Sequence, residues 1–199
     1  MNKSLFGKVA KSNSDEIDKL FGVWNDIFLD TVDLHGYFPR QNLYGPVAFK
    51  IRTEFMLNKD YDIWITKDNP INWNREDANK ERYFENVREL RDNWDNYQRQ
   101  WKMVTIKNQN NPILFDYVEE VIVDDPRVKK GDTIYFNECV RILKEALLVN
   151  PPLKNRFKTR QCNNCFCRNT HKASYGQHLT SHPPTDILKN NKYDLSSLR

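Results

Sequence analysis

The sequence predicts a mainly α protein, in which a helical body with a short strand or hairpin precedes a small C-terminal module. Three segments support this prediction because their apolar residues recur every three or four positions, at 14–34, 75–102 and 134–149. The clearest segment is the second, whose heptad-spaced seam consists of Tyr83, Val87, Leu90, Trp94, Tyr97 and Trp101. The body is therefore expected to be built from packed helices.

Shorter patterns assign the rest of the body. Residues 46–57 fit both an alternating strand and a helix that begins at Pro46, and the helix is preferred. Residues 61–68 predict a short extended piece, and residues 113–122 have apolar residues at helical spacing. Cys139, within the last predicted helix, is expected to be a small core residue.

Pro151 and Pro152 end the last predicted helix and mark a domain boundary. The sequence divides there into a helical body over residues 1–150, a basic module over 151–185 and a polar tail over 186–199. The whole chain of 199 residues has a net charge of only +4, so the basic module stands out locally.

Six basic side chains and no acidic one lie in residues 146–185: Lys154, Arg156, Lys158, Arg160, Arg168 and Lys172. The first four alternate along the chain, so an extended conformation would place them on one side, at a spacing that suits a phosphate backbone. An acidic protein surface or plain solvent fits the same pattern. The run predicts a contact with RNA, DNA or an acidic partner, or else a solvated linker.

The basic module also contains a cysteine and histidine motif. The segment CNNCFCRNTHKASYGQHLTSH has the spacing C-x2-C-x12-H-x3-H, formed by Cys162, Cys165, His178 and His182. Over residues 162–182 only, it resembles the C2H2 zinc finger. The resemblance implies a ββα-like module with one structural Zn²⁺, held tetrahedrally by two thiolates and two imidazoles. Clustered cysteines near histidines also indicate a reducing, intracellular compartment.

The segment departs from the zinc-finger pattern where a finger has its own small core. Those positions hold Arg160, Asn169 and Tyr175, of which only Tyr175 could pack in a core. The module is therefore expected to pack against the rest of the chain or against a partner. Cys167 and His171 lie inside the motif and are alternative ligands.

No pattern typical of a catalytic site is found in the sequence, and four protein ligands would leave no position for water on the zinc. The chain is therefore expected not to be an enzyme. His35 follows the end of the first predicted helix, where a capping or surface role is expected.

The sequence thus predicts a non-enzymatic accessory or structural subunit of a large assembly, anchored by its zinc site and basic tail to protein or RNA partners. The aromatic seam supplies four predicted protein-docking residues, with an ordinary core helix as the alternative: Tyr83, Trp94, Tyr97 and Trp101. The other function classes left open are a stand-alone nucleic-acid-binding zinc-finger regulator and a viral structural protein.

A mitochondrial complex or a ribonucleoprotein is the favoured assembly. The first 14 residues contain three lysines and no acid, as mitochondrial targeting segments and ordinary polar N-termini both do. No run of apolar residues is long enough to predict a membrane span.

Overall fold

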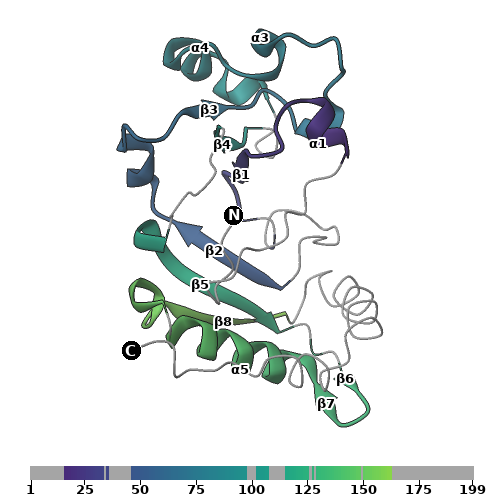
Figure 1. The fold of residues 1–199 in the computed structure, drawn as a ribbon, viewed down its shortest axis with the longest axis vertical. Coiled ribbons are helices and arrows are strands. Elements are labelled where there is room, and N and C mark those ends of the chain that lie inside the picture. The colour runs from purple at the N-terminus through teal and green to yellow at the C-terminus, as the bar shows by residue number, and fades with distance from the viewer. Residues whose placement is uncertain are drawn as a thin grey trace.

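The computed structural model describes residues 16–33, 35, 46–97, 102–107, 115–125, 127, 129–148 and 150–162. Within these ranges the chain is a mixed α/β protein, so the prediction of a mainly α fold is wrong. Two three-stranded sheets form an upper and a lower layer, and a β6-β7 hairpin extends from the lower one (Figure 1). None of the helices in these ranges combines the length and apolar character needed to cross a bilayer.

The upper layer is built on a small antiparallel sheet with β4 (Val104–Ile106) between β1 (Ile27–Leu29) and β3 (Ile63–Ile65). The first predicted helix ends early, after α1 (Glu16–Leu20), because Gly22 adopts a φ of 70° and turns the chain toward β1. The other elements of this layer are η1 (Thr53–Leu57), η2 (Pro70–Asn72), α3 (Asn79–Arg82), α4 (Val87–Asp92) and η3 (Trp94–Asn96).

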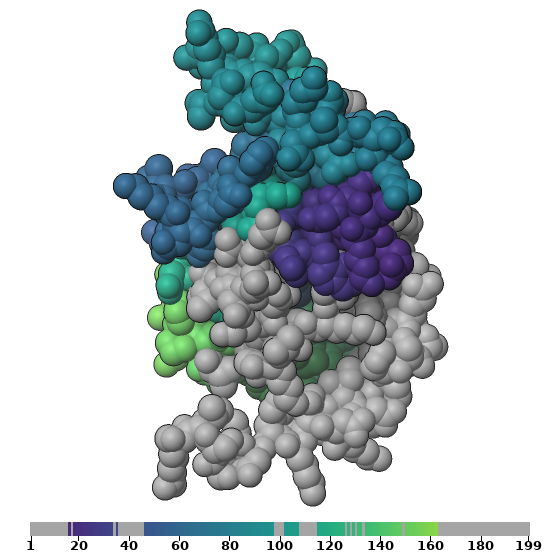
Figure 2. Space-filling model, turned by 45° about the horizontal axis from the view of Figure 1, so that its top comes forward, coloured from purple at the N-terminus to yellow at the C-terminus, as the bar shows by residue number. Residues whose placement is uncertain are grey.

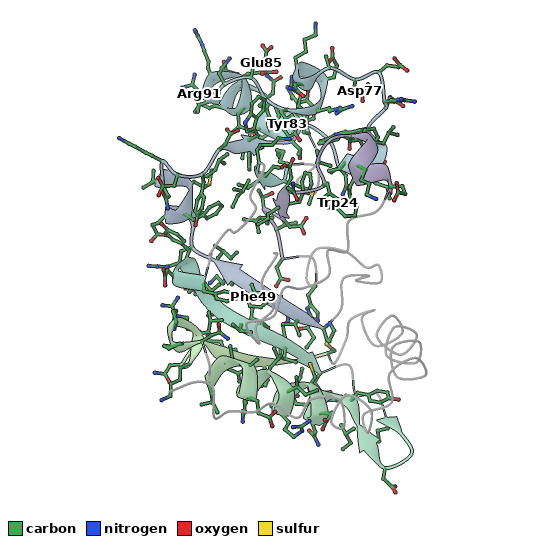
Figure 3. The ribbon with its side chains drawn as sticks, viewed as in Figure 1. Trp24, Phe49, Asp77, Tyr83, Glu85 and Arg91 are labelled. Carbon is green, nitrogen blue, oxygen red and sulfur yellow. The ribbon has the colours of Figure 1, made fainter. Side chains whose placement is uncertain are left out.

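The predicted long helix over residues 75–102 is replaced, in its described part, by short pieces. The chain is extended at Tyr83, with φ −129° and ψ 153°, and α4 starts afresh after the N-cap Asn86. Tyr83 is only 2% exposed and packs edge-on against Trp64 and Trp73, with ring centroids 5.2 Å away in each case. Tyr83 of the seam is therefore a core side chain of the upper layer, whereas Val87 is 79% exposed. Glu85 and Arg91 lie at the outer margin of this layer (Figure 3).

The lower layer has β5 (Val118–Asp125) at its centre, antiparallel to β2 (Val47–Ile51) and parallel to β8 (Phe157–Gln161). The helical predictions for residues 46–57 and 113–122 are therefore wrong. Their β-branched residues favour strands, and the sheet buries Val121 and Val123 completely. The short η5 (Phe115–Tyr117) precedes β5.

The last predicted helix of the body is confirmed as α5 (Tyr135–Leu148). It covers one face of the lower sheet (Figure 1) and buries Leu143, Ala146 and Leu147, while Cys139 is half-buried. The hairpin of β6 (Lys129–Lys130) and β7 (Thr133–Ile134) leads into this helix. The β5-β6-β7-α5-β8 order thus makes α5 part of the crossover between two parallel strands.

Residues 151–162, assigned from sequence to the basic module, pack into the lower layer. The η6 turn (Pro151–Leu153) buries Leu153 fully against Val118, Val121 and Leu147. β8 then pairs with β5 from Val121↔Phe157 to Asp125↔Gln161. The rest of the predicted ββα-like module and the polar tail lie outside the described residues, so these parts of the domain division stay a prediction.

Candidate metal centre

Three side chains with metal-binding atoms meet where β5 and β8 end. Asp124 lies near the end of β5, Cys162 directly follows β8, and His35 comes from the segment after β1. One donor atom from each lies within 4.8 Å of the other two. The side chains of His35 and Asp124 are 12% and 2% exposed, and Cys162 is 3% exposed. Asp124 and Cys162 are therefore buried, and His35 is half-buried.

The strand pairing explains how Cys162 reaches this position. Its backbone N–H donates to Asp125 O at 3.1 Å, so the ladder between β8 and β5 continues to Cys162. Side chains alternate along an extended chain, so Cys162 lies on the same face as Arg160 and Lys158. Asp124 is on that face too, because paired residues of parallel strands point the same way and Asp124 pairs with Arg160.

The central contact of the group joins His35 to Cys162, with Nε2 3.3 Å from Sγ. Zinc bonds of about 2.1 Å to nitrogen and about 2.3 Å to sulfur, at a tetrahedral angle, place the two donor atoms about 3.6 Å apart. The observed distance is close to that value. It also fits a hydrogen bond from a protonated Nε2 to sulfur, so the contact suits both a metal-free and a metal-bound state.

Asp124 is engaged mainly by Arg160. Arg160 donates from Nε to Oδ1 at 2.6 Å and from Nη2 to Oδ2 at 3.2 Å, whereas His35 Nε2 is 4.0 Å from Oδ1. Arg160 also pairs through Nη1 with Asp33, whose Oδ1 accepts the backbone N–H of His35 at 3.1 Å. The guanidinium thus ties the His35 segment to the sheet, and Asp124 is a weaker ligand candidate than His35 or Cys162.

The geometry favours coordination over nucleophilic catalysis. In a cysteine–histidine–aspartate triad, one imidazole nitrogen serves the thiol and the other faces the carboxylate. Here the same atom, His35 Nε2, faces both Cys162 and Asp124. Burial, followed by the negative charge of Asp124, raises the pKa of the Cys162 thiol to about 11. Without a metal the thiol is therefore protonated at neutral pH, the less reactive form.

Only one of the four zinc ligands predicted from sequence lies in the described part of the chain. Cys162 is one of the three clustered residues, whereas Cys165, His178 and His182 lie outside the described residues, as do the alternatives Cys167 and His171. His35 was expected to cap a helix or lie at the surface, and that expectation is wrong. No local signal in the sequence connects His35 with Cys162, 127 residues further along.

The predicted basic run is partly neutralised by the protein itself. Lys158 pairs with Glu120, and Arg160 with Asp124 and Asp33. Lys154 is exposed and Arg156 half-buried, and neither forms an ion pair with another residue that the structure describes. Arg168 and Lys172 lie outside that part. The proposed phosphate-binding role of the run stays a prediction.

The predicted docking residues occupy different environments. Tyr83 is in the upper core, and Tyr97 is half-buried with its ring 5.2 Å from that of Phe84. Trp94 is 38% exposed, with Lys102 Nζ 4.0 Å from its ring centroid, and Trp101 lies outside the described residues. The segment with α3 and α4 forms a projection at one end of the molecule (Figure 2). Their docking role stays a prediction.

Comparisons with protein-family models, with curated proteins and with solved structures found no match to the chain. The function must therefore be inferred from the fold and from this group of side chains.

Proposed function

We propose that the chain is a non-enzymatic structural subunit of a larger intracellular assembly, whose C-terminal segment is fastened to its body by one structural zinc ion. The observation that carries the proposal is the buried contact between His35 Nε2 and Cys162 Sγ at 3.3 Å. A zinc ion at this point would hold the end of β8 and the segment that follows β1. Such a closed site supplies folding energy rather than chemistry.

Charge pairing supports a protein partner more than a nucleic acid. Lys158 and Arg160, which the sequence predicts to lie on one side of an extended segment, are paired with acidic residues of the chain's own body. A phosphate backbone would have to compete with these carboxylates for the same cations. Exposed apolar side chains offer contact area on the upper layer: Leu57, Ile71 and Val87, which are 81%, 80% and 79% exposed.

The test of this function is native sedimentation of the full chain from its source cells, with and without ribonuclease. We expect the protein to sediment well above its own 23.8 kDa, before and after ribonuclease treatment. Loss of the large species with ribonuclease would place RNA in the assembly. Sedimentation of the native protein as a monomer would contradict the proposal.

A zinc-site variant makes this test specific. Cys165→Ser, which removes a predicted ligand, should shift the protein toward the monomer fraction, because the C-terminal segment would no longer be fixed. Cys139→Ser is the matched control, since Cys139 lies on α5 outside the site. The control should sediment like the unaltered chain.

A further inference from the structure

We infer that His35 is itself a zinc ligand, so that the zinc shell is shared between the body and the C-terminal segment. This inference rests on the proposed zinc site and names its donors. It replaces a self-contained C2H2 finger by a site with Cys162 and His35 on the described side. Two further ligands would come from the residues after Cys162, where the sequence provides Cys165.

The first support is the position of the two donor atoms. His35 Nε2 and Cys162 Sγ lie 3.3 Å apart, close to the separation of about 3.6 Å expected for nitrogen and sulfur on one tetrahedral zinc. The two residues come from segments 127 positions apart in sequence, yet each is fixed by its own backbone hydrogen bond, to Asp33 Oδ1 and Asp125 O respectively. The pair is therefore preorganised for a metal.

The second support is the role of Arg160. A self-folding finger has an apolar core residue two positions before its first cysteine, and this chain has Arg160 there. Arg160 instead binds Asp124 and Asp33 in the body. The start of the motif is thus attached to the sheet and to the His35 segment. In place of the apolar core contact of a finger, Arg160 makes contacts that hold the His35 segment close to the proposed zinc site.

The number of ligands on zinc limits which histidines can belong to the site. Structural zinc is almost always bound by four protein ligands. If Cys162, His35 and Cys165 are three of them, at most one of His178 and His182 can be the fourth, and Cys167 or His171 could take that position instead. An autonomous finger would need both of these histidines and would not need His35.

Zinc content per chain, measured by mass spectrometry on the purified full-length protein, separates the two arrangements. We expect one zinc in the unaltered chain and loss of zinc in His35→Ala and Cys165→Ser. Of His178→Ala and His182→Ala, at most one should lose zinc. Cys139→Ser is the matched control, because it removes a thiol on α5 that lies outside the site. It should retain the full zinc content.

A second variant guards against simple misfolding of His35→Ala. His35→Gln keeps a side chain that can donate a hydrogen bond to Cys162 Sγ but lacks the imidazole nitrogen that binds zinc, so a folded His35→Gln chain should also lose its zinc. A residue that only packs beside the site would leave the zinc content unchanged. Full zinc content in a folded His35→Gln chain would overturn the inference.

The remaining outcomes distinguish the inference from the proposed function. Full zinc content in His35→Ala, with loss in both His178→Ala and His182→Ala, would overturn the role of His35 and leave the structural zinc intact. A purified chain that contains no zinc and takes up no added Zn²⁺ would overturn both.

Discussion

Arg160 binds the Asp124 carboxylate through two hydrogen bonds, Nε to Oδ1 at 2.6 Å and Nη2 to Oδ2 at 3.2 Å. The two residues face each other in the parallel pairing of β5 and β8. Asp124 is 2% exposed and has Arg160 as its main partner, whereas the 25% exposed Arg160 side chain has a second acidic partner in Asp33. Substitution of Arg160 and substitution of Asp124 should therefore change the stability of the protein by different amounts.

Arg160→Ala should destabilise the protein more than Asp124→Asn. Removing the cation leaves a buried carboxylate without its main partner, at a cost of about 3 kcal/mol in the free energy of unfolding. Asp124→Asn leaves Arg160 paired with Asp33 and should cost about 1 kcal/mol. Urea unfolding followed by circular dichroism measures both values. Equal losses of unfolding free energy, or a larger loss for Asp124→Asn, would show that the ion pair with Asp33 does not stabilise Arg160.

Glu120→Gln should strengthen RNA binding because it releases Lys158 from its intramolecular ion pair. One additional phosphate contact should steepen the dependence of log affinity on log salt by about 0.7 for a single strand. Fluorescence anisotropy with a short single-stranded RNA measures this slope.

Glu119→Gln is the matched control for that experiment. It makes the same change of charge one residue away but releases Lys50 of β2 instead of Lys158. The salt dependence of Glu119→Gln should change less than that of Glu120→Gln, because Lys50 lies on β2 and outside the basic run. If the unaltered chain already binds RNA tightly and Lys158→Gln abolishes the binding, Glu120 does not neutralise Lys158 as the structure implies.

Tyr83 should matter for stability rather than for docking alone. Tyr83→Ala removes a ring buried among Trp64 and Trp73 and should cost about 3 kcal/mol. Tyr83→Phe keeps the ring but loses the hydrogen bond from Lys107 Nζ at 3.2 Å, so it should cost about 1 kcal/mol. Val87→Ala, at a 79% exposed position, should change stability by less than about 0.5 kcal/mol.

Thermal unfolding of these three variants checks the assignment of Tyr83 to the core. If Tyr83→Ala unfolds at the same temperature as Val87→Ala, Tyr83 is not part of the upper core. The original interpretation of a surface docking residue would then be favoured.

The ion pair of Lys67 with Glu89 should make stability depend on pH. A hydrogen bond from Lys67 lowers the pKa of Glu89 below its ordinary value of 4.5, and the backbone N–H of Glu85 lowers it further. Because the folded pKa is the lower one, the stabilisation is present above pH 4.5 and is lost as the pH falls through the folded pKa.

Glu89→Gln should therefore lower the unfolding temperature at pH 7, and its difference from the unaltered chain should shrink as the pH falls below 4.5. Calorimetry across this pH range measures the difference. Glu76→Gln, at an exposed position in a turn, is the control and should show a much smaller difference at neutral pH. A constant difference for Glu89→Gln at all pH values would contradict the role of its charge.

The elements predicted correctly are those in which sequence pattern and packing agree. The helix predicted at 134–149 is α5 (Tyr135–Leu148), since its apolar residues repeat with one period throughout and face one sheet. β5 was assigned to a helix because Val118 and Val121 are three positions apart. That spacing also arises in a strand with a bulge, and the β-branched run from Val121 to Val123 is the better guide.

The candidate site was predictable only as far as its local spacing. Cys162 and Cys165 form a pattern within a few residues, whereas His35 joins Cys162 through the topology of the lower sheet. The parallel pairing of β8 with β5 brings Cys162 beside Asp124. Arg160 pairs with Asp33, and Asp33 accepts a hydrogen bond from the backbone of His35. No periodicity within one segment contains that information.

The central claim is that one structural zinc fixes the C-terminal segment to the body. Its most direct test is the zinc content of the purified full-length chain, measured together with the unfolding temperature before and after chelation under reducing conditions. We predict one zinc per chain, and a clear fall in unfolding temperature when the zinc is removed. A chain without zinc that takes up no added Zn²⁺ and unfolds at the same temperature with or without chelator would contradict the claim.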